Sequence, residues 1–504
     1  MIPDLRAIRR LYAIFFFALF LFFLTMMNGE DLQGYETDWL LALDPLTGLS
    51  VILTSGMLYS ALAWSVLIVV LTLFFGRFFC SWICPLGILN QFTGYLFSFL
   101  RPKEDYARNR YRSYFSLKYY ILLSLLVLSL FGALQIGLFD PLALITRSFI
   151  LGIFPALQQW NLPLGTSQML VHGGVGLALI FIALILANRF IPRFWCRTLC
   201  PLGALLGVLS WRAPFRIRRN VDRCTDCMAC MRHCQGACDP QGELRISECH
   251  VCLNCIRECP HDALHFGLPG EKSSIHAPID VSRRRLVETT VAAALFHPML
   301  SSADSSRTEP LPGVIRPPGS LPESDFLARC IKCGACMKVC PTHVLQPALL
   351  ESGIEGVWTP ILIPKLGYCE HHCVLCGQVC PTAAIRPISV AEKVGVGGFK
   401  TPVKLGTAFY DRGRCLPWAM QTECIVCEEM CPTSPKAIWY QKKKVVDREG
   451  QVKVLKQPFV DPELCIGCGI CENKCPVQDL PAIRVSSVGE SRSKDNQMIL
   501  RSGR

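Results

Sequence analysis

Long apolar stretches and cysteine-rich stretches divide the chain into two halves. The apolar residues are concentrated before about residue 212, and the cysteines and prolines after it. Four stretches, at approximately 11–27, 57–75, 119–139 and 169–190, are long enough to cross a bilayer as helices, which takes roughly 20 residues. The run from Tyr12 to Leu24 has no polar face, which favours a membrane span over the buried helix hairpin of a soluble protein. The pattern predicts a membrane domain with four transmembrane helices at 1–215, followed by a soluble half.

Lysine and arginine positions orient this membrane domain. The chain has a net charge of +12, and its basic residues lie mainly beside the predicted spans. They occur before the first span, between the second and third, and after the fourth, whereas the loop after the first span is acidic and has no Lys or Arg. Because cytoplasmic loops carry the excess of basic residues, both ends of the membrane domain are predicted to face the cytoplasm. The C-terminal half has no basic stripe with interleaved aromatics, which argues against nucleic-acid binding.

An internal repeat follows the second and fourth predicted spans. Its copies read Arg77-Phe-Phe-Cys80-Ser-Trp-Ile-Cys84-Pro-Leu-Gly and Arg193-Phe-Trp-Cys196-Arg-Thr-Leu-Cys200-Pro-Leu-Gly. Cysteines four residues apart share one face of a helix. The two pairs could supply four thiolates to one metal site or form two redox dithiols, and four buried free thiols are the plainer alternative. The sequence leaves these interpretations open.

His172 lies near the outer end of the fourth predicted span and is the only histidine in a span. A bis-histidine haem needs two such residues, so haem b in the membrane is not expected. Ionisable groups inside membranes are often functional, and His172 could bond a quinol hydroxyl. It could equally be a structural residue at the membrane interface.

The soluble half is marked by cysteine runs, and the whole chain has 29 cysteines. Disulfide scaffolds are usually short secreted domains, which leaves zinc and iron–sulfur clusters to compare. At 216–268, two runs have the spacing of bacterial ferredoxins, in which the fourth cysteine of each run serves the other cluster. The spacing predicts one [4Fe–4S] cluster on Cys224, Cys227, Cys230 and Cys259, and another on Cys249, Cys252, Cys255 and Cys234.

Four further runs follow at 326–486, and each ends in Cys-Pro. Two of them have a stretched first gap, which lengthens a loop at little entropic cost. Zinc ribbons use two pairs separated by a longer gap, often with histidine, so these runs favour iron–sulfur clusters. About six clusters are expected in total, and apart from the repeat pairs only Cys238 has no assigned partner. The four runs are Cys330, Cys333, Cys336, Cys340; Cys369, Cys373, Cys376, Cys380; Cys415, Cys424, Cys427, Cys431; and Cys465, Cys468, Cys471, Cys475.

A linker of different composition, 269–325, separates the two cluster-binding regions. It contains Ser282-Arg283-Arg284-Arg285-Leu-Val, followed by a modest apolar run within 289–302 that His297 and Pro298 interrupt. The basic motif is similar to a twin-arginine export signal inside the chain, and a basic linker patch is the alternative. Whether 289–302 spans the membrane is left open, because the run is short for a span. The last residues, 487–504, have the composition of a disordered tail.

Together these motifs resemble two families of ferredoxin. The four spans, the two Cys-x3-Cys-Pro repeats and the two-cluster region are similar to the NapH-type membrane ferredoxins of periplasmic nitrate reductase systems. The second half resembles the NapG/MauM-type ferredoxins through the Ser282-Arg283-Arg284 signal, Cys330-Ile-Lys-Cys333-Gly-Ala-Cys336, Asp411-Arg-Gly-Arg-Cys415 and Cys465-Ile-Gly-Cys468-Gly. The chain resembles a natural fusion of the two. This implies a multi-domain fold, in which an α-helical membrane domain precedes α+β ferredoxin domains.

The resemblance implies an electron-transfer subunit of a quinol dehydrogenase in the cell inner membrane. Electrons would leave the membrane quinone pool, with quinol as the donor, and reach a periplasmic reductase or its multihaem cytochrome partner. The first cluster-binding region would be cytoplasmic and the four-cluster region periplasmic. The resemblance also implies crossed ligation in the four-cluster region, with Cys340 exchanged for Cys475 and Cys380 for Cys431.

Two other functions compete with this one. A maturation factor for redox or metal cofactors would use the Cys-x3-Cys-Pro thiols. A redox-sensing regulator would need a DNA-binding, kinase or nucleotide motif, and the chain has none. No nucleophile–base arrangement is readable either, so the cofactors are expected to carry the chemistry.

Overall fold

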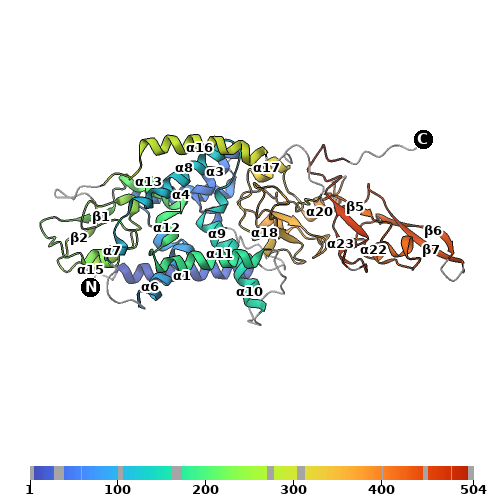
Figure 1. Ribbon diagram of the computed structural model, residues 1–504, viewed down its shortest axis with the longest axis horizontal. Coiled ribbons are helices and arrows are strands. Elements are labelled where there is room, and N and C mark those ends of the chain that lie inside the picture. Colours follow the sequence, from blue (N-terminus) through green and yellow to red (C-terminus); the bar gives the residue numbers. More distant parts are fainter. Residues whose placement is uncertain are drawn as a thin grey trace.

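The computed structural model describes residues 5–27, 39–57, 59–99, 106–159, 173–268, 277–302, 313–399, 401–446, 452–477 and 479–497. Three parts of the protein follow one another along its longest axis (Figure 1). The first cluster region (213–268) lies at one end, the helical domain (5–212) in the middle, and the second cluster region (313–497) at the other end. The two cysteine-rich regions are therefore separated by the helices.

Four helices of the helical domain coincide with the predicted spans. They are α1 (Leu5–Met26), α4 (Ser65–Phe75), α8 (Leu117–Leu130) and α11 (Gly174–Leu186). Only two apolar helical segments among the described residues, Arg6–Met26 and Ser113–Leu130, are long enough to cross a membrane. The apolar segments at Leu62–Phe75 and Gly174–Arg189 are shorter than this, although each includes residues of a 3-10 turn at one end. These turns are η1 (Ser60–Trp64) and η5 (Ala187–Arg189).

Two short buried helices lie between the longer ones, and their common start is a second internal repeat. α3 (Pro45–Ser55) and α9 (Pro141–Ser148) each follow an aspartate and begin with Pro-Leu. The side chain of Asp44 accepts a hydrogen bond from the Leu46 backbone N–H at 2.9 Å, and Asp140 caps α9 in the same way. Proline suits the first helical position, where no intrahelical bond is lost. Both aspartates are buried, and their carboxyl groups lie close enough to interact.

Each Cys-x3-Cys-Pro repeat folds as a short helix, a turn and a second helix that begins at the proline. α5 (Phe79–Trp82) leads into α6 (Pro85–Phe99), and α12 (Phe194–Thr198) leads into α13 (Pro201–Leu209). Gly87 is required in the first copy, since a Cβ there would lie 2.2 Å from the Cys80 carbonyl oxygen. The remaining elements of the domain are α2 (Trp39–Ala42), α7 (Tyr106–Asn109), α10 (Phe154–Gln159), η2 (Ser113–Ser116), η3 (Ile136–Leu138), the π-helix η4 (Phe149–Ile153) and η6 (Ser210–Arg212).

Large apolar side chains are exposed on the outside of the helical domain. They include Leu11, Ile14 and Phe15 on α1, Val66, Val70 and Leu73 on α4, and Val175, Leu179 and Ile182 on α11. Buried polar and charged groups, among them Arg9, Arg77 and Arg147, lie inside. Extensive exposed apolar surface marks contact with a membrane or with another protein.

The first cluster region is a small α+β unit held against the helical domain. β1 (Arg216–Arg219) pairs antiparallel with β2 (Leu264–Gly267), and α14 (Ala229–Arg232), η7 (Ile246–Glu248) and α15 (Asn254–Glu258) lie between them in the chain. Buried Glu248 accepts hydrogen bonds from Lys118 and from the Tyr119 hydroxyl, the latter at 2.8 Å. Arg77 Nη1 donates to the Ser247 carbonyl at 2.6 Å. Buried polar contacts thus fix this region to one end of the helices.

The linker contains one long helix, α16 (Arg283–Ser302), which lies against α8 and runs from the first cluster region toward the second (Figure 1). It includes the apolar run predicted at 289–302, with Pro298 inside the helix. Val287, Val291 and Leu295 are exposed on its surface. The linker therefore passes along the whole helical domain.

The second cluster region is made of short elements. Its strands β3 (Leu345–Pro347), β4 (Pro360–Leu362), β5 (Thr407–Tyr410), β6 (Ile438–Val446), β7 (Val452–Val460) and β8 (Ile483–Ser486) form three antiparallel pairs, β3–β4, β5–β8 and β6–β7. Its helices are α17 (Glu323–Leu327), α18 (Ala335–Lys338), α19 (Leu375–Gln378), α20 (Val390–Val394), α21 (Leu416–Ala419), α22 (Val426–Glu429) and α23 (Ile470–Asn473). Because the regular elements are so short, most of the chain here is loop around the cysteines.

Buried polar contacts also fix the second cluster region to the helical domain, at the end opposite to the first. Lys332 Nζ donates to Gln135 Oε1 at 2.7 Å, and Arg147 Nη1 donates to the Lys332 carbonyl at 3.1 Å. Thr54 Oγ1 donates to the Ala328 carbonyl at 2.7 Å. A Cβ at Gly137 would lie 1.9 Å from the Ile331 carbonyl oxygen, so the two backbones are in close contact.

The start of the predicted disordered tail is packed against the second cluster region. Arg492 donates to Glu323 at 2.5 Å, and the Asn496 side-chain amide donates to the Ser487 carbonyl at 2.9 Å. Glu490 and Asn496 are buried. The prediction of disorder from residue 487 is wrong for 487–497, because these ion pairs offset the polar composition; residues 498–504 lie outside the described residues.

We expect Glu323 to stabilise the second cluster region in a pH-dependent way. Burial alone would raise its pKa, but Arg316 and Arg492 lower the pKa of Glu323 to about 2, from 4.5. A lowered folded-state pKa stabilises the fold above pH 4.5, and this stabilisation is lost as the pH falls toward about 2. Glu323→Gln should lower the free energy of unfolding by about 2 kcal/mol at neutral pH, which is the usual size for hydrogen bonds to charged groups. Urea unfolding would measure this loss.

Glu392→Gln is the matched control, because Glu392 pairs with the exposed Arg386 and exposed pairs contribute little. A loss of stability that is equal for both variants, or a Glu323→Gln effect that persists below pH 2, would contradict this role of Glu323.

Candidate functional site: the cysteine groups

In the first cluster region the structure brings together the cysteines that the spacing predicts. A cavity is lined by Cys224, Cys227, Cys230 and Cys259. Cys255, Cys252, Cys249 and Cys234 lie close together in a second group, and burial and these neighbours raise the pKa of Cys255. Each group takes its fourth cysteine from the other run, which ties the two halves of the region together.

In the second cluster region the grouping differs from the one implied by family resemblance. A cavity contains Cys465, Cys468 and Cys471 with Cys431, and Cys415 lies near Cys424, Cys427 and Cys475. Likewise Cys380 lies near Cys330, Cys333 and Cys336, and Cys340 near Cys369, Cys373 and Cys376.

The runs therefore exchange fourth cysteines with their sequence neighbours, first with second and third with fourth. The expected exchanges of Cys340 with Cys475 and of Cys380 with Cys431 are wrong in this structure. Exchange between neighbouring runs needs only short connections, whereas the expected outer exchange would join the two ends of the region.

The loops around these groups share a strained backbone that suits a [4Fe–4S] cluster. In each of the four evenly spaced runs, the second and fourth residues after the first cysteine have positive φ; they are Asp226 and Met228, Val251 and Leu253, Lys332 and Gly334, and Gly467 and Gly469. Positive φ is costly for a β-branched residue such as Val251. It turns backbone N–H groups toward the sulfurs, as the Lys332 N–H toward Cys330. Among the described residues, no group of three or more His, Cys, Asp or Glu side chains has the geometry of a single-ion site.

Two polar side chains that the sequence does not point to reach cysteine sulfurs. The buried Lys393 Nζ donates to Cys369 Sγ at 3.3 Å and to the carbonyls of Glu370 and Cys373 at 2.6 Å each. The Tyr410 hydroxyl lies 2.9 Å from Cys427 Sγ. Lys393 comes 13 residues after the end of its run, so no local motif could reveal it.

Cys238, which had no assigned partner, lies inside a cysteine group. Its sulfur is 3.5 Å from Cys234 Sγ, and its side chain also hydrogen-bonds to Cys249. The group of Cys234, Cys249, Cys252 and Cys255 therefore contains a fifth thiol.

The four cysteines of the Cys-x3-Cys-Pro repeats gather into one buried group in the helical domain. Burial raises the pKa of Cys84, and the neighbouring thiols of Cys196 and Cys80 raise it further. Cys200 lies close enough to the same thiols to interact with them electrostatically. All four are free cysteines, so the structure brings the two pairs together and forms no disulfide between them.

Buried cationic and amide groups surround these thiols. Asn90 Nδ2 lies 3.7 Å from Cys196 Sγ, and the Gly203 N–H donates to Cys200 Sγ at 3.2 Å. Arg77 Nε and Nη2 and Arg193 Nε have no hydrogen-bond partner in the described part of the chain. Orphaned buried N–H groups beside four thiols fit an anionic group at this position.

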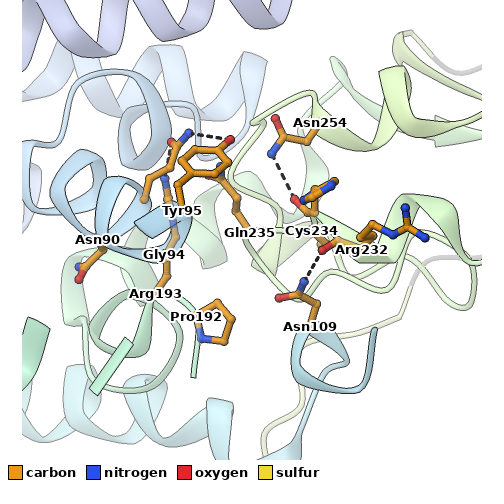
Figure 2. Close-up of a pocket in the computed structure, with 12 residues that line it drawn as sticks. Asn90, Gly94, Tyr95, Asn109, Pro192, Arg193, Arg232, Cys234, Gln235 and Asn254 are labelled. Atoms are coloured by element: carbon orange, nitrogen blue, oxygen red, sulfur yellow. Dashed lines mark hydrogen bonds between the residues drawn. The ribbon is translucent and has the colours of Figure 1, made fainter. Parts of the chain in front are cut away.

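The candidate quinol contact His172 lies outside the described residues. A polar pocket lies instead at the junction of the helical domain and the first cluster region (Figure 2). Tyr95, Asn90 and Arg193 line it from the helices, and Cys234 and Asn254 from the cluster loops.

Several segments of the chain match iron–sulfur families. Residues 57–104 and 173–221 match a family described as 4Fe-4S binding domain, and these segments include both Cys-x3-Cys-Pro repeats. Residues 329–385 match a 4Fe-4S dicluster domain, and residues 458–478 match a further 4Fe-4S binding domain. No solved structure matches the chain.

Curated relatives are ferredoxin-type proteins. The methylamine utilization protein MauM of Methylophilus methylotrophus is 32% identical over 222 residues, which are 43% of this chain and 91% of the relative. This chain belongs to the family of MauM ferredoxin-type proteins. The ferredoxin-type protein NapG of Escherichia coli (strain K12) is 31% identical over 34% of this chain and 69% of its own length. YccM of the same organism, provisionally named an electron transport protein, is 30% identical over 43% of this chain, and the chain spans 58% of its length.

Family and structure agree on the cofactor. The protein is an iron–sulfur electron-transfer protein that binds several [4Fe–4S] clusters. Clusters of this kind supply one-electron transfer, and the protein sets their potentials through hydrogen bonds and charge near the sulfurs.

We predict that Lys393→Met lowers the reduction potential of the centre bound by Cys369, Cys373, Cys376 and Cys340. The Lys393 ammonium stabilises the added negative charge of the reduced state, so its loss favours the oxidised state. The shift should be on the order of tens of millivolts, since about 59 mV corresponds to a tenfold change for one electron. Redox titration followed by EPR would measure it.

Lys393→Arg keeps the charge and should keep the potential nearer to wild type. Lys436→Met removes a lysine that pairs with Glu428 at the surface, and it should leave the reduction potential of this centre unchanged. An unchanged potential in Lys393→Met with full iron content would rule out this role.

We expect Cys238 to substitute for Cys234 as a ligand. Cys238→Ser should retain the full iron content, and Cys234→Ser should retain most of it, with an altered EPR signal. The double variant should lose the four iron atoms of one cluster, measured by iron and acid-labile sulfide analysis. If Cys234→Ser alone loses those four irons, Cys238 is not a substitute.

Proposed function

We propose that this protein carries electrons from membrane quinol, through its [4Fe–4S] clusters, to a periplasmic oxidoreductase or its cytochrome partner. We also propose that it combines a NapH-type membrane half with the MauM/NapG-type half. The observation that carries the proposal is the position of the two cluster regions, at opposite ends of a helical domain with an apolar outer surface. Electron transfer across a membrane needs this separation.

Several features support an inner-membrane, multi-pass location for the helical domain. Large apolar side chains are exposed on α1, α4 and α11, while several charged groups, among them Arg77 and Arg147, are buried inside. Two of its apolar segments have the length of a span. The helix α16 begins within the twin-arginine-like motif and connects the two ends, so it would return the chain across the membrane. In this arrangement the first cluster region is cytoplasmic and the second is periplasmic.

We assign six clusters to the six cysteine groups described above. The group of Cys330, Cys333, Cys336 and Cys380 is attached to the helical domain, because Lys332, between its first two ligands, bonds to Gln135. Buried Arg147 contacts the same loop through the Lys332 carbonyl. These residues hold the second cluster region in a fixed position on the helices.

A further metal centre on Cys80, Cys84, Cys196 and Cys200 fits the same function. The thiols are 4–7% exposed, which favours a resident group over exchange with a client protein. A maturation factor would need thiols that a client can reach, so this burial weighs against the alternative. Arg77 and Arg193 would stabilise the negative charge of a thiolate-bound group.

The proposal predicts that the C-terminus is periplasmic. β-Lactamase fused after Arg504 of the full chain should make cells resistant to ampicillin, because the enzyme protects the cell wall only from outside the cytoplasm and can be exported as a folded protein. Lys replacement of Arg283 and Arg284 tests the export motif and should abolish the resistance. Ampicillin sensitivity with a membrane-inserted, iron-loaded fusion would contradict the proposed topology.

A further inference from the structure

An apolar cavity of about 320 Å³ opens between α1 and α6. Ala13 and Ile14 of α1 and Ile88 and Phe92 of α6 form its apolar walls. Ile14 and Phe92 are each 65% exposed and belong to the apolar outer surface of the helical domain. The cavity therefore opens where lipid would lie under the proposed function.

One end of this cavity is polar. Arg10, Gln91 and Tyr95 line it. The Tyr95 hydroxyl accepts hydrogen bonds from Arg10 Nη2 at 3.2 Å and from Gln91 Nε2 at 3.4 Å. The cavity thus has apolar walls and one polar end, where a phenol, an amide and a guanidinium group meet. This shape matches a molecule with an apolar tail and a small hydrogen-bonding head.

The polar end continues to the cysteines of the first cluster region. Gln91 and Tyr95 also line the pocket in Figure 2, which Cys234 lines from the other side. Gln91 Oε1 accepts hydrogen bonds from Arg9 Nη1 at 2.8 Å and from Arg193 Nη2 at 3.1 Å. Arg193 Nη1 lies 3.3 Å from His250 Nδ1, in the run that begins at Cys249. A head group bonded to Gln91 would be connected to the cluster loop at His250 through the side chains of Gln91 and Arg193.

We propose that the cavity between α1 and α6 binds a membrane quinol. Tyr95 and Gln91 bond its hydroxyl groups, and Ile14 and Phe92 contact its apolar tail. This assignment rests on the function proposed above, and it moves the quinol site from His172 to the cytoplasmic end of the helices. A phospholipid fits less well, because two of the three nearby arginines, Arg9 and Arg193, already bond to Gln91 and are buried, whereas a neutral hydroxyl needs only the phenol and the amide.

The test uses the full, cluster-loaded protein in lipid nanodiscs. A photoreactive short-chain quinone should label peptides from α1 and α6, and excess unlabelled decyl-quinone should compete. Replacing neutral by anionic phospholipid should leave labelling unchanged. Labelling that anionic lipid abolishes, while decyl-quinone does not compete, would assign the cavity to lipid and overturn the proposal.

Two variants and a matched control complete the test. Tyr95→Phe removes the hydroxyl and should raise the decyl-quinol concentration for half-maximal cluster bleaching about tenfold, equivalent to one hydrogen bond of about 1.4 kcal/mol. Phe92→Trp places a larger side chain in the cavity wall, which leaves less room for the quinone and should reduce labelling. Tyr114→Phe is the control, because Tyr114 makes a similar hydrogen bond with Arg112 but does not line the cavity. Iron content shows that each variant is folded.

The outcomes separate this site from the wider function. If decyl-quinol bleaches the wild-type clusters, but Tyr95→Phe and Phe92→Trp behave like Tyr114→Phe and the label maps elsewhere, the site is wrong and the function stands. If decyl-quinol neither bleaches the clusters of the wild-type protein nor binds to it, both the proposed site and the proposed function are wrong.

Discussion

Four cysteine sulfurs must surround each cluster, and the fourth must come from a neighbouring run. This constraint organises both cluster regions, in which most regular elements apart from β6 and β7 have only three to five residues. Strands such as β1 and β2 have four residues each, and the helices next to the cysteines are four or five residues long. Exchange of the fourth ligand joins each pair of runs into one unit. The left-handed residues Val251 and Leu253 persist because the loop has to wrap around a cluster rather than relax.

The cysteine groups could be predicted where the signal is local. The spacing of Cys224 to Cys259 determines both groups of the first cluster region, since the runs are adjacent and only one exchange is open to them. In the second cluster region four runs allow several exchanges, and only the three-dimensional structure distinguishes them. Lys393 could not be found, because the thiol that it reaches is 24 residues away.

The helical domain was predicted in outline but not in its interior. Apolar length predicts the outer helices, and the structure describes apolar helical segments at Leu62–Phe75 and Gly174–Arg189 within the predicted spans at 57–75 and 169–190. α3 and α9 have 11 and 8 residues and lie between the predicted spans, so they are too short for hydropathy to mark them as spans. The tail at 487–497 has polar composition, and its order comes from pairing between Arg492 and the distant Glu323. Long-range ion pairs of this kind leave no local pattern.

The helical domain is built twice. Each half has an outer helix, an Asp-Pro-Leu helix, a second outer helix and a Cys-x3-Cys-Pro turn, and the halves meet where Asp44 joins Asp140 and Cys80 and Cys84 join Cys196 and Cys200. Neither half by itself contains all four thiols or both carboxyl groups. A shorter protein with one such unit could assemble the same centre only by pairing with a second copy of itself, and in the present chain covalent linkage makes that assembly independent of concentration.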